Sequence, residues 1–179
     1  MLEHLSIHKD FLKEIFTCDS RKVLEAGCGS AIMSIFLAMT GLEVTACDRD
    51  DEVLKKAGET ATRWKAKLRF TKEDILKFSF ADDAFDLVFS QGVLEHLNDE
   101  QIRRAGAEAL RVGKTFVFSV PGPYYKHRDF GDERLLSENA WKKLFAGLGR
   151  FEIKPYYRIR TKKNFLVERP LMLMGILTR

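Results

Sequence analysis

Lys-Val-Leu-Glu-Ala-Gly-Cys-Gly-Ser-Ala, residues 22–31, is the stretch that decides the fold. Lys22 to Ala26 predicts a short buried strand, because its apolar residues suit a strand that is covered on both faces. The apolar run Ile32 to Met39 predicts a helix that packs back on this strand. Between them, Gly27 and Gly29 allow a tight turn and leave main-chain atoms open to a ligand. The N–H groups at the start of the helix face the same spot, so the pattern predicts a nucleotide-type binding turn.

Two common nucleotide motifs do not match this turn. The dinucleotide fingerprint G-x-G-x-x-G has Ile32 at its last position, which argues against NAD or FAD. The Gly-Lys-Ser/Thr of a P-loop is absent too. Instead, Glu25 stands two residues before the first glycine. A carboxylate there would repel a pyrophosphate, but it could hold the cationic amino-acid end of a ligand, directly or through water.

Residues 25–31 resemble motif I, E/D-x-G-x-G-x-G, of the class I S-adenosylmethionine-dependent methyltransferases. Ala31 stands where the family usually has its third glycine, and its methyl group makes the turn slightly more crowded. The resemblance implies S-adenosyl-L-methionine as cofactor and S-adenosyl-L-homocysteine as product. It also implies cofactor contacts by Glu25, Gly27, Cys28 and Gly29. The alternative is a glycine turn that only reverses the chain.

The length of 179 residues fits one domain, 1–179, with a sizeable core. No apolar run is long enough to span a membrane, and residues 1–10 carry His and charges where a secretory signal would be apolar. We therefore expect a soluble, cytoplasmic protein. The cysteines form no C-x-x-C pair, and Cys28 and Cys47 are interpreted as small buried residues. A net charge of +4 is too modest to indicate a nucleic-acid partner by itself.

The second predicted strand, Leu42 to Asp48, ends in an acid. Asp48 lies 21 positions after Gly27, close to the spacing at which such folds place a ribose-binding carboxylate. The alternative role for Asp48 is to cap the next helix, predicted over Asp50 to Lys65, but Asp50 is the better cap. We favour the ribose role for Asp48.

Two further adenosine contacts are expected near the next strand ends. Arg49 could lie against the adenine face. Lys67 to Thr71 predicts the third strand, and Asp74 and Ile75 follow it. Their position resembles the adenine contact of the family, where the Asp accepts a hydrogen bond from the exocyclic amine and Ile packs on the ring. An exposed turn acid is the alternative for Asp74.

Phe85 to Leu97 is the second informative stretch, with an apolar strand that ends at Ser90 and a short helix after it. It resembles F-D-x-V-x-x-x-x-V-L-E-H, a pattern of the type 11 methyltransferase group, which includes quinone-biosynthesis methyltransferases and other small-molecule enzymes. Because ligands bind at the carboxyl ends of such strands, Ser90 and Gln91 are expected nearest the sulfonium.

Glu95 and His96 allow two chemical interpretations. Some quinone O-methyltransferases use E-x-x-E-H as a metal site, but Gly92 replaces the first Glu here. Two ligands are too few, so we predict no metal. His96 could act as general base for a hydroxyl acceptor, because imidazole titrates near neutral pH. The alternative, slightly favoured, is that both residues only cap and pin the helix.

The fifth strand, Lys114 to Val120, is followed by a loop over residues 121–136 that is rich in aromatic and charged groups. Long ordered loops at a ligand edge are usually functional. The loop matches the place where family members build the acceptor pocket. The substrate candidates are therefore Tyr124, Tyr125, His127 and Arg128, and His127 rivals His96 as a base.

The rest of the chain is predicted to complete the sheet and its helices. An amphipathic helix over Leu2 to Phe16, within an N-terminal cover at 1–17, precedes the first strand. Two more helices are expected, Asn98 to Leu110 and one beginning at Ser137. Two final strands, Phe151 to Arg160 and Leu171 to Thr178, resemble the antiparallel pair of the family. The run that connects them is basic, with Arg158, Arg160, Lys162, Lys163 and Arg169, and forms a solvated hairpin or a patch that steers an anionic partner.

The resemblance implies a Rossmann-like, doubly wound α/β fold with a seven-stranded sheet in the order 3-2-1-4-5-7-6 and helices on both faces. The function it implies is methyl transfer from S-adenosylmethionine to a small-molecule acceptor. Two alternatives stay open at this point: a cofactor-binding protein without turnover, and an RNA methyltransferase that uses the basic hairpin.

Overall fold

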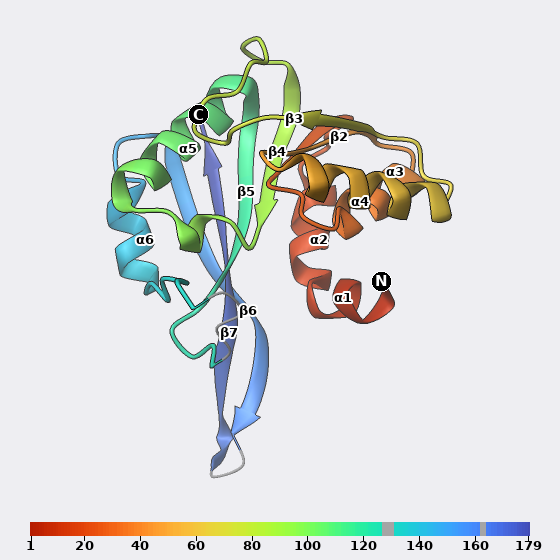
Figure 1. Ribbon diagram of the computed structural model, residues 1–179. Helices are drawn as coiled ribbons and strands as arrows, with labels where there is room; N and C mark the ends of the chain where they lie inside the picture. The colour runs from red at the N-terminus through yellow and green to blue at the C-terminus, as the bar shows by residue number, and fades with distance from the viewer. Residues whose placement is uncertain (127–130, 162–163) are drawn as a thin grey trace.

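Seven strands form one sheet in the computed structural model, in the order β3-β2-β1-β4-β5-β7-β6 (Figure 1). The structure describes residues 1–126, 131–161 and 164–179, with side chains described for all of these except 158–161 and 164–170. The strands are β1 (Lys22–Ala26), β2 (Glu43–Asp48), β3 (Arg69–Lys72), β4 (Phe85–Gln91), β5 (Gly113–Pro121), β6 (Arg150–Thr161) and β7 (Asn164–Thr178). Strands β1 to β5 pair in parallel, and β7 is antiparallel to both of its neighbours. This order confirms the predicted Rossmann-like sheet.

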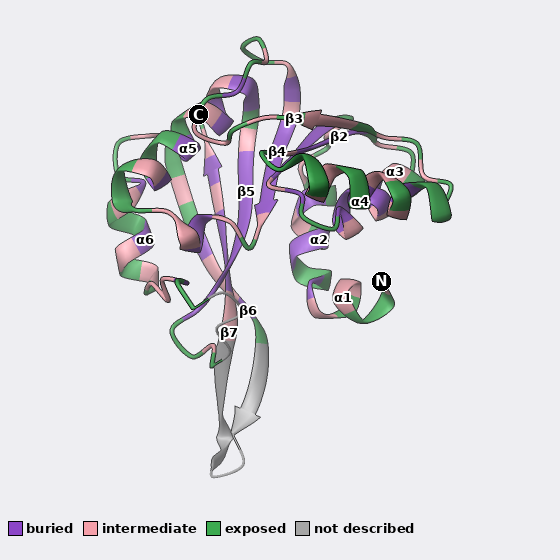
Figure 2. Ribbon diagram, in the orientation of Figure 1, coloured by how far each residue is buried: buried purple, intermediate pink, exposed green. Residues whose placement is uncertain are grey.

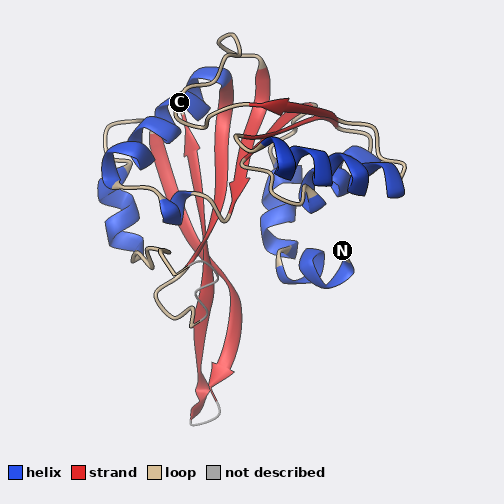
Figure 3. Cartoon of the chain, viewed as in Figure 1, coloured by secondary structure: helices blue, strands red, loops and turns tan. Residues whose placement is uncertain are grey.

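Helices cover both faces of the sheet (Figure 3). They are α1 (Leu2–Ile7), α2 (Lys9–Thr17), α3 (Ile32–Met39), α4 (Asp51–Arg63), the 3₁₀ helix η1 (Leu94–His96), α5 (Asp99–Val112) and α6 (Glu138–Leu144). Residues of α5 and α6 share one core cluster with alternate residues of the central strands, such as Leu24 and Phe116. Residues of α2 and α3 share a second core cluster with the strand residues that point to the opposite face of the sheet, such as Val23 and Val117. This alternation follows from the two-residue period of a strand.

The central strands are buried almost throughout, as Figure 2 shows in purple. Their apolar runs are those expected for parallel strands that are covered on both faces. The carboxyl ends of β1, β2 and β4 lie along one edge of the sheet, because these strands are parallel and adjacent. Short turns, η1 and the segment after β5 leave from that same edge, and α1 lies at this end of the molecule too (Figure 1).

The predicted N-terminal helix over Leu2 to Phe16 is wrong as a single element. The structure has two helices, α1 and α2, that are separated at His8. The His8 side chain is buried and its Nδ1 hydrogen-bonds the Tyr156 hydroxyl at 2.8 Å, so a long-range contact fixes the position of the break. Phe16 is 45% exposed, and Phe11 is buried in the core.

The N-cap residues of three helices are those at which the sequence predicts each helix to begin. Asp50 caps α4 by accepting from the backbone N–H groups of Glu52 and Val53. Asn98 caps α5 in a reciprocal capping box, and Ser137 caps α6. Such side-chain caps satisfy backbone donors that lack a partner inside the helix.

The final strand is longer than the predicted Leu171 to Thr178, because β7 pairs with β6 back to Asn164. The basic side chains predicted for this hairpin, from Arg158 to Arg169, lie outside the residues whose side chains are described. In the described parts of the chain, no helix combines the length and apolar character needed to cross a membrane.

Candidate functional site

The turn after β1 has left-handed backbone at three alternate residues: φ is +71° at Gly27, +50° at Gly29 and +54° at Ala31. A Cβ on Gly27 would lie 2.6 Å from Cγ2 of Val93, so both the conformation and the space require glycine there. Nothing lies within 4 Å of a Cβ on Gly29. Ala31 adopts a conformation that glycine takes at lower cost, which is a physical reason for a glycine at this position of the motif.

Glu25 is buried at the end of β1, and its carboxylate accepts a hydrogen bond from the backbone N–H of Ser34 at 3.2 Å. Ala31, the N-cap of α3, makes no side-chain cap bond, so Glu25 supplies an acceptor to the first turn of this helix. Burial raises the pKa of Glu25 to about 8. A buried carboxyl with a raised pKa is suited to a cationic partner, which would stabilise its charged form.

Asp48 links the end of β2 to the glycine turn. Its Oδ2 accepts from the Gly29 N–H at 3.1 Å, and its Oδ1 accepts from the Asp50 N–H at 3.2 Å. The Cys28 N–H donates to the Cys47 carbonyl at 2.8 Å, which joins the same two segments. Since Asp50 caps α4, Asp48 is not needed as its cap. The carboxylate is therefore fixed at the turn, and each of its oxygens keeps a lone pair for another donor.

The two cysteines beside the turn are buried. Burial raises the pKa of the Cys47 thiol to about 12 and raises that of Cys28 as well. Both thiols are protonated at neutral pH and do not suit a nucleophile. The interpretation as small buried residues is confirmed.

The structure places the other predicted adenosine contacts around the ends of β2 and β3. Arg49 is exposed directly after Asp48. Asp74 is exposed, and its Oδ1 accepts from the Leu76 N–H at 2.9 Å in a local turn, as its alternative interpretation expected. Ile75 packs at the border of the large core cluster. An adenine contact by these three residues stays a prediction.

At the end of β4, Ser90 is buried and its Oγ has no hydrogen-bond partner among the described residues. The next residue, Gln91, accepts a hydrogen bond at its Oε1 from Nε2 of His4 in α1, at 3.1 Å. His4 belongs to no sequence motif and lies 87 positions from Gln91, so its place here could not be predicted from the sequence.

A second missed group lies beside this one. The Tyr156 hydroxyl of β6 hydrogen-bonds both the Ser119 hydroxyl of β5 and Nδ1 of His8. The His4 and His8 rings lie 4.7 Å apart, centroid to centroid. Burial, with a smaller contribution from His4, lowers the pKa of His8 to about 4. His8 is therefore neutral at physiological pH.

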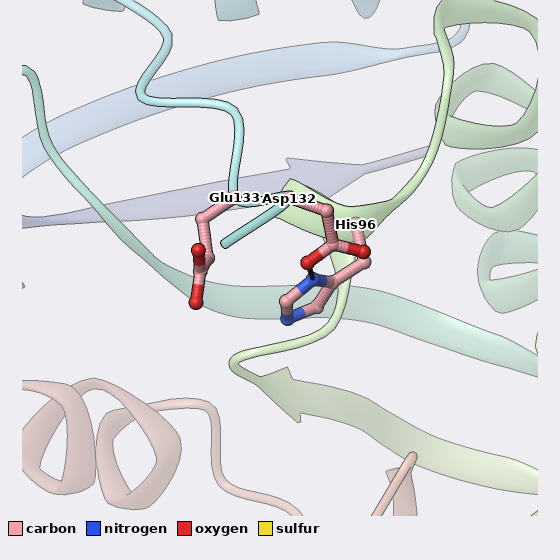
Figure 4. Close-up of side chains that lie close together, drawn as sticks. All are labelled: His96, Asp132 and Glu133. Carbon is pink, nitrogen blue, oxygen red and sulfur yellow. Dashed lines mark hydrogen bonds and ion pairs between the residues drawn. The ribbon is translucent and has the colours of Figure 1, made fainter. Parts of the chain in front are cut away.

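His96 ends η1, and its Nδ1 donates to Oδ1 of Asp132 at 2.7 Å. Ligand atoms of His96, Asp132 and Glu133 lie within 4.8 Å of one another, and Figure 4 shows their side chains side by side. From the sequence, only Glu95 and His96 were candidate metal ligands. The group in the structure differs because residues 131–133, in the loop after β5, approach η1. A set of one imidazole and two carboxylates matches what several divalent metals accept.

Glu95 precedes His96 and is buried, with its Oε2 lacking a hydrogen-bond partner among the described residues. Burial raises its pKa, and Glu133 and Asp132 add to the shift. Its backbone carbonyl accepts from the Arg134 N–H at 2.9 Å, so η1 and the loop after β5 are held together.

In that loop, Tyr124 is exposed, and Tyr125 is half-buried with its N–H bonded to the Gly122 carbonyl at 3.0 Å. The other two acceptor candidates, His127 and Arg128, lie outside the described residues. The acceptor role of all four stays a prediction.

Comparison with known proteins gives the site its context. Residues 23–115, more than half of the chain, match the family described as Methyltransferase domain. The ubiquinone biosynthesis O-methyltransferase of Hydrogenovibrio crunogenus is 29% identical over 121 residues, covering 65% of this chain and 49% of that protein. The enzyme of the same name from Coxiella burnetii is 26% identical over 112 residues, covering 62% and 48%. The chain thus spans about half the length of the curated relatives it matches.

Solved structures share the fold. The PH0226 protein from Pyrococcus horikoshii aligns with a TM-score of 0.73 at 18% identity, covering 98% of this chain and 89% of that one. The magnesium protoporphyrin IX methyltransferase from Synechocystis, solved with bound S-adenosylhomocysteine (SAH), aligns with a TM-score of 0.72 at 16% identity, covering 98% and 84%. With the sheet order, the glycine turn and the match over residues 23–115, these findings show that the chain belongs to the methyltransferase domain family.

Proposed function

We propose that this chain is an S-adenosylmethionine-dependent methyltransferase that acts on a hydroxyl group of a small molecule. The observation that carries the proposal is the glycine turn after β1, held against Asp48 by the hydrogen bond from Gly29. The turn offers bare backbone, and the acid offers two oxygens for a diol such as ribose.

The residues fit this cofactor in two respects. No described atom lies within 4 Å of the place where a Cβ on Gly29 would stand, so the backbone of the turn is open to a ligand there. The buried Oγ of Ser90, at the end of β4, has no partner among the described residues and would face the reacting end of a ligand at this edge. A buried hydroxyl without a partner costs stability, which fits a ligand-binding role.

The cofactor and the site residues would have separate roles in methyl transfer. The cofactor supplies a methyl group activated by a sulfonium leaving group. Asp48 would bind the ribose hydroxyls, and Glu25 would balance the charge of the cationic amino-acid end. Ser90 and Gln91, at the end of β4, would lie nearest the methyl group. Rate enhancement then comes mainly from holding the acceptor oxygen in line with the methyl carbon.

The names of relatives support oxygen as the acceptor atom. Both curated relatives are called O-methyltransferases. The Synechocystis structure contains S-adenosylhomocysteine, the product expected of such a transfer. A small-molecule acceptor is also consistent with the net charge of +4, which gives no special affinity for nucleic acid.

The test has two parts. Calorimetry with S-adenosylmethionine and SAH measures binding, and transfer of a labelled methyl group to a pool of cell metabolites measures turnover. Binding with labelled product supports the proposal. Tight binding without labelled product would favour the cofactor-binding protein without turnover, and label in RNA with salt-sensitive RNA binding would favour the RNA methyltransferase.

A further inference from the structure

Five polar side chains from four parts of the chain meet at the carboxyl ends of β4 and β5. Gln91 and Ser119 are paired in register on these two strands. His4 donates to Gln91, while Tyr156 bonds both Ser119 and His8. The two histidine rings are in contact at 4.7 Å, so the group is continuous from β4 to β5.

This polar group lies next to the glycine turn. Glu25 of β1 is in register with Phe89 of β4. Gly27 and Gln91 each come two residues after this pair, so they occupy corresponding positions at the carboxyl ends of the two parallel strands. At the other end of α1, Met1 packs against a core cluster that includes Cys28 and Ala31 of the turn. Helix α1 therefore runs from the cofactor turn to the end of β5.

The hydrogen bond to Gln91 sets the tautomer of the neutral His4 ring. A side-chain carbonyl only accepts, so Nε2 of His4 carries a hydrogen; when the ring is neutral, Nδ1 keeps its lone pair, and no hydrogen bond to Nδ1 is found among the described residues. The ring is half-buried in a helix that buries none of its residues completely, so a ligand can reach it. We propose that His4 is the general base that removes the proton from the acceptor hydroxyl.

His8 differs from His4 in its surroundings. It is buried, bonded to Tyr156, and remains neutral well below neutral pH. Its partner Tyr156 is in turn affected at longer range by the acids Asp10 and Glu95. We assign His8 as a positioning residue, which supports the His4 ring from one side while Gln91 holds it from the other.

Of the two histidines that the sequence offered as bases, His96 is less suited than His4. Nδ1 of His96 already donates to Asp132, at the far end of η1 from Gln91. His127 lies outside the described residues. The base role assigned to His4 rests on the proposed function, because it requires a hydroxyl acceptor and a methyl donor in this site.

The step balances as follows. The acceptor O–H proton passes to Nδ1 of His4 while the oxygen lone pair forms a bond to the methyl carbon. The bond between that carbon and the sulfonium breaks, and its electron pair remains on sulfur as the neutral thioether. The imidazolium then returns its proton to water.

The test compares His4→Gln with wild type on two probe acceptors, catechol and the more acidic 4-nitrocatechol, at a pH where only the second is ionised. The Gln amide keeps an N–H for Gln91 but offers no base. We expect kcat on catechol to fall by about 100-fold or more, the range of general-base catalysis, with a much smaller loss on 4-nitrocatechol and partial rescue by added imidazole. The control, Glu3→Gln, changes an exposed residue of the same helix and should leave both rates unchanged.

Each other result has a defined meaning. An equal loss on both acceptors, or no loss on either, would overturn the base role of His4. If wild type binds SAH but methylates neither probe, the base role is also overturned while the cofactor assignment survives. If wild type does not bind SAH, the proposed function itself fails. Circular dichroism of each variant checks the fold.

Discussion

The Asp48 carboxylate accepts a hydrogen bond from the Gly29 amide at 3.1 Å, across the gap between β2 and the glycine turn. A second hydrogen bond, from Asp50, fixes its other oxygen. The acid is thus oriented before any ligand arrives, which lowers the entropy cost of binding. The turn and the acid form one unit, and most of the expected behaviour of the site follows from it.

The first prediction concerns the charge of this unit. Asp48→Asn keeps an acceptor oxygen but removes the negative charge, and we expect SAH to bind about 10- to 100-fold more weakly, since hydrogen bonds to charged groups contribute about 1.5–3 kcal/mol. The matched control is Asp50→Asn, which makes the same change at the α4 cap, where Asn serves equally well. Calorimetry checks both. Equal affinities of the two variants would contradict the ribose role of Asp48.

The second prediction concerns the two glycines. Gly27→Ala combines left-handed strain with a Cβ placed 2.6 Å from Val93, and should lower the free energy of unfolding by about 2–4 kcal/mol. Gly29→Ala meets no neighbour within 4 Å and should cost about 1 kcal/mol from strain alone. Urea unfolding measures both. A second substitution, Val93→Ala, should recover part of the lost free energy of unfolding in Gly27→Ala but not in Gly29→Ala. Recovery in both variants would show that the clash with Val93 is not the cause of the loss.

The third prediction uses the raised pKa of Glu25, about 8. At pH 7 the free protein holds this carboxyl mainly protonated, and a cationic ligand group would favour the carboxylate. Cofactor binding should therefore release up to one proton. Calorimetry at pH 7 in phosphate and in Tris would then give different heats, and Glu25→Gln should remove the difference. Identical heats for wild type in both buffers would argue against an ionic contact.

The fourth prediction concerns His8. Its pKa is about 4 in the folded chain and 6.5 in the unfolded chain, so the folded state disfavours the proton. The stabilising contribution of neutral His8 is complete above pH 6.5 and is lost as the pH falls toward 4, by at most about 3 kcal/mol. His8→Asn can keep a bond to Tyr156 but does not titrate. Unfolding curves at several pH values should show a smaller loss for this variant between pH 6.5 and 4 than for wild type, and parallel losses would exclude His8 as the source.

The fifth prediction concerns His96, Asp132 and Glu133. We expect methyl transfer to need no metal, because the sulfonium is itself a good leaving group and His96 is engaged by Asp132. Treatment with a chelator should leave both SAH binding and label transfer unchanged. Activity that is lost on chelation and returns with Mg²⁺ would assign this cluster as a metal site.

Much of the fold could be predicted from local sequence. Lys22–Ala26 and Ile32–Met39 have the predicted bounds, since a buried strand, a glycine turn and an apolar helix each leave a local pattern. The caps Asp50, Asn98 and Ser137 were predicted for the same reason. The sheet order came from the family resemblance and is confirmed.

Contacts between distant residues could not be predicted. The break at His8 depends on Tyr156, 148 positions away, whereas the helical pattern runs through it. The bond from His4 to Gln91 and the approach of Asp132 to His96 also depend on tertiary structure, so His4 and the three-ligand cluster were missed. Glu25 was identified by its spacing, but its bond to Ser34 was visible only in the structure.

The most direct test of the central claim is calorimetric titration of the folded protein with SAH and with NAD. The glycine turn with Asp48 predicts saturable binding of SAH that weakens in Asp48→Asn, and no binding of NAD, because Ile32 stands where the dinucleotide fingerprint needs its last glycine. Binding of NAD without binding of SAH would contradict the account.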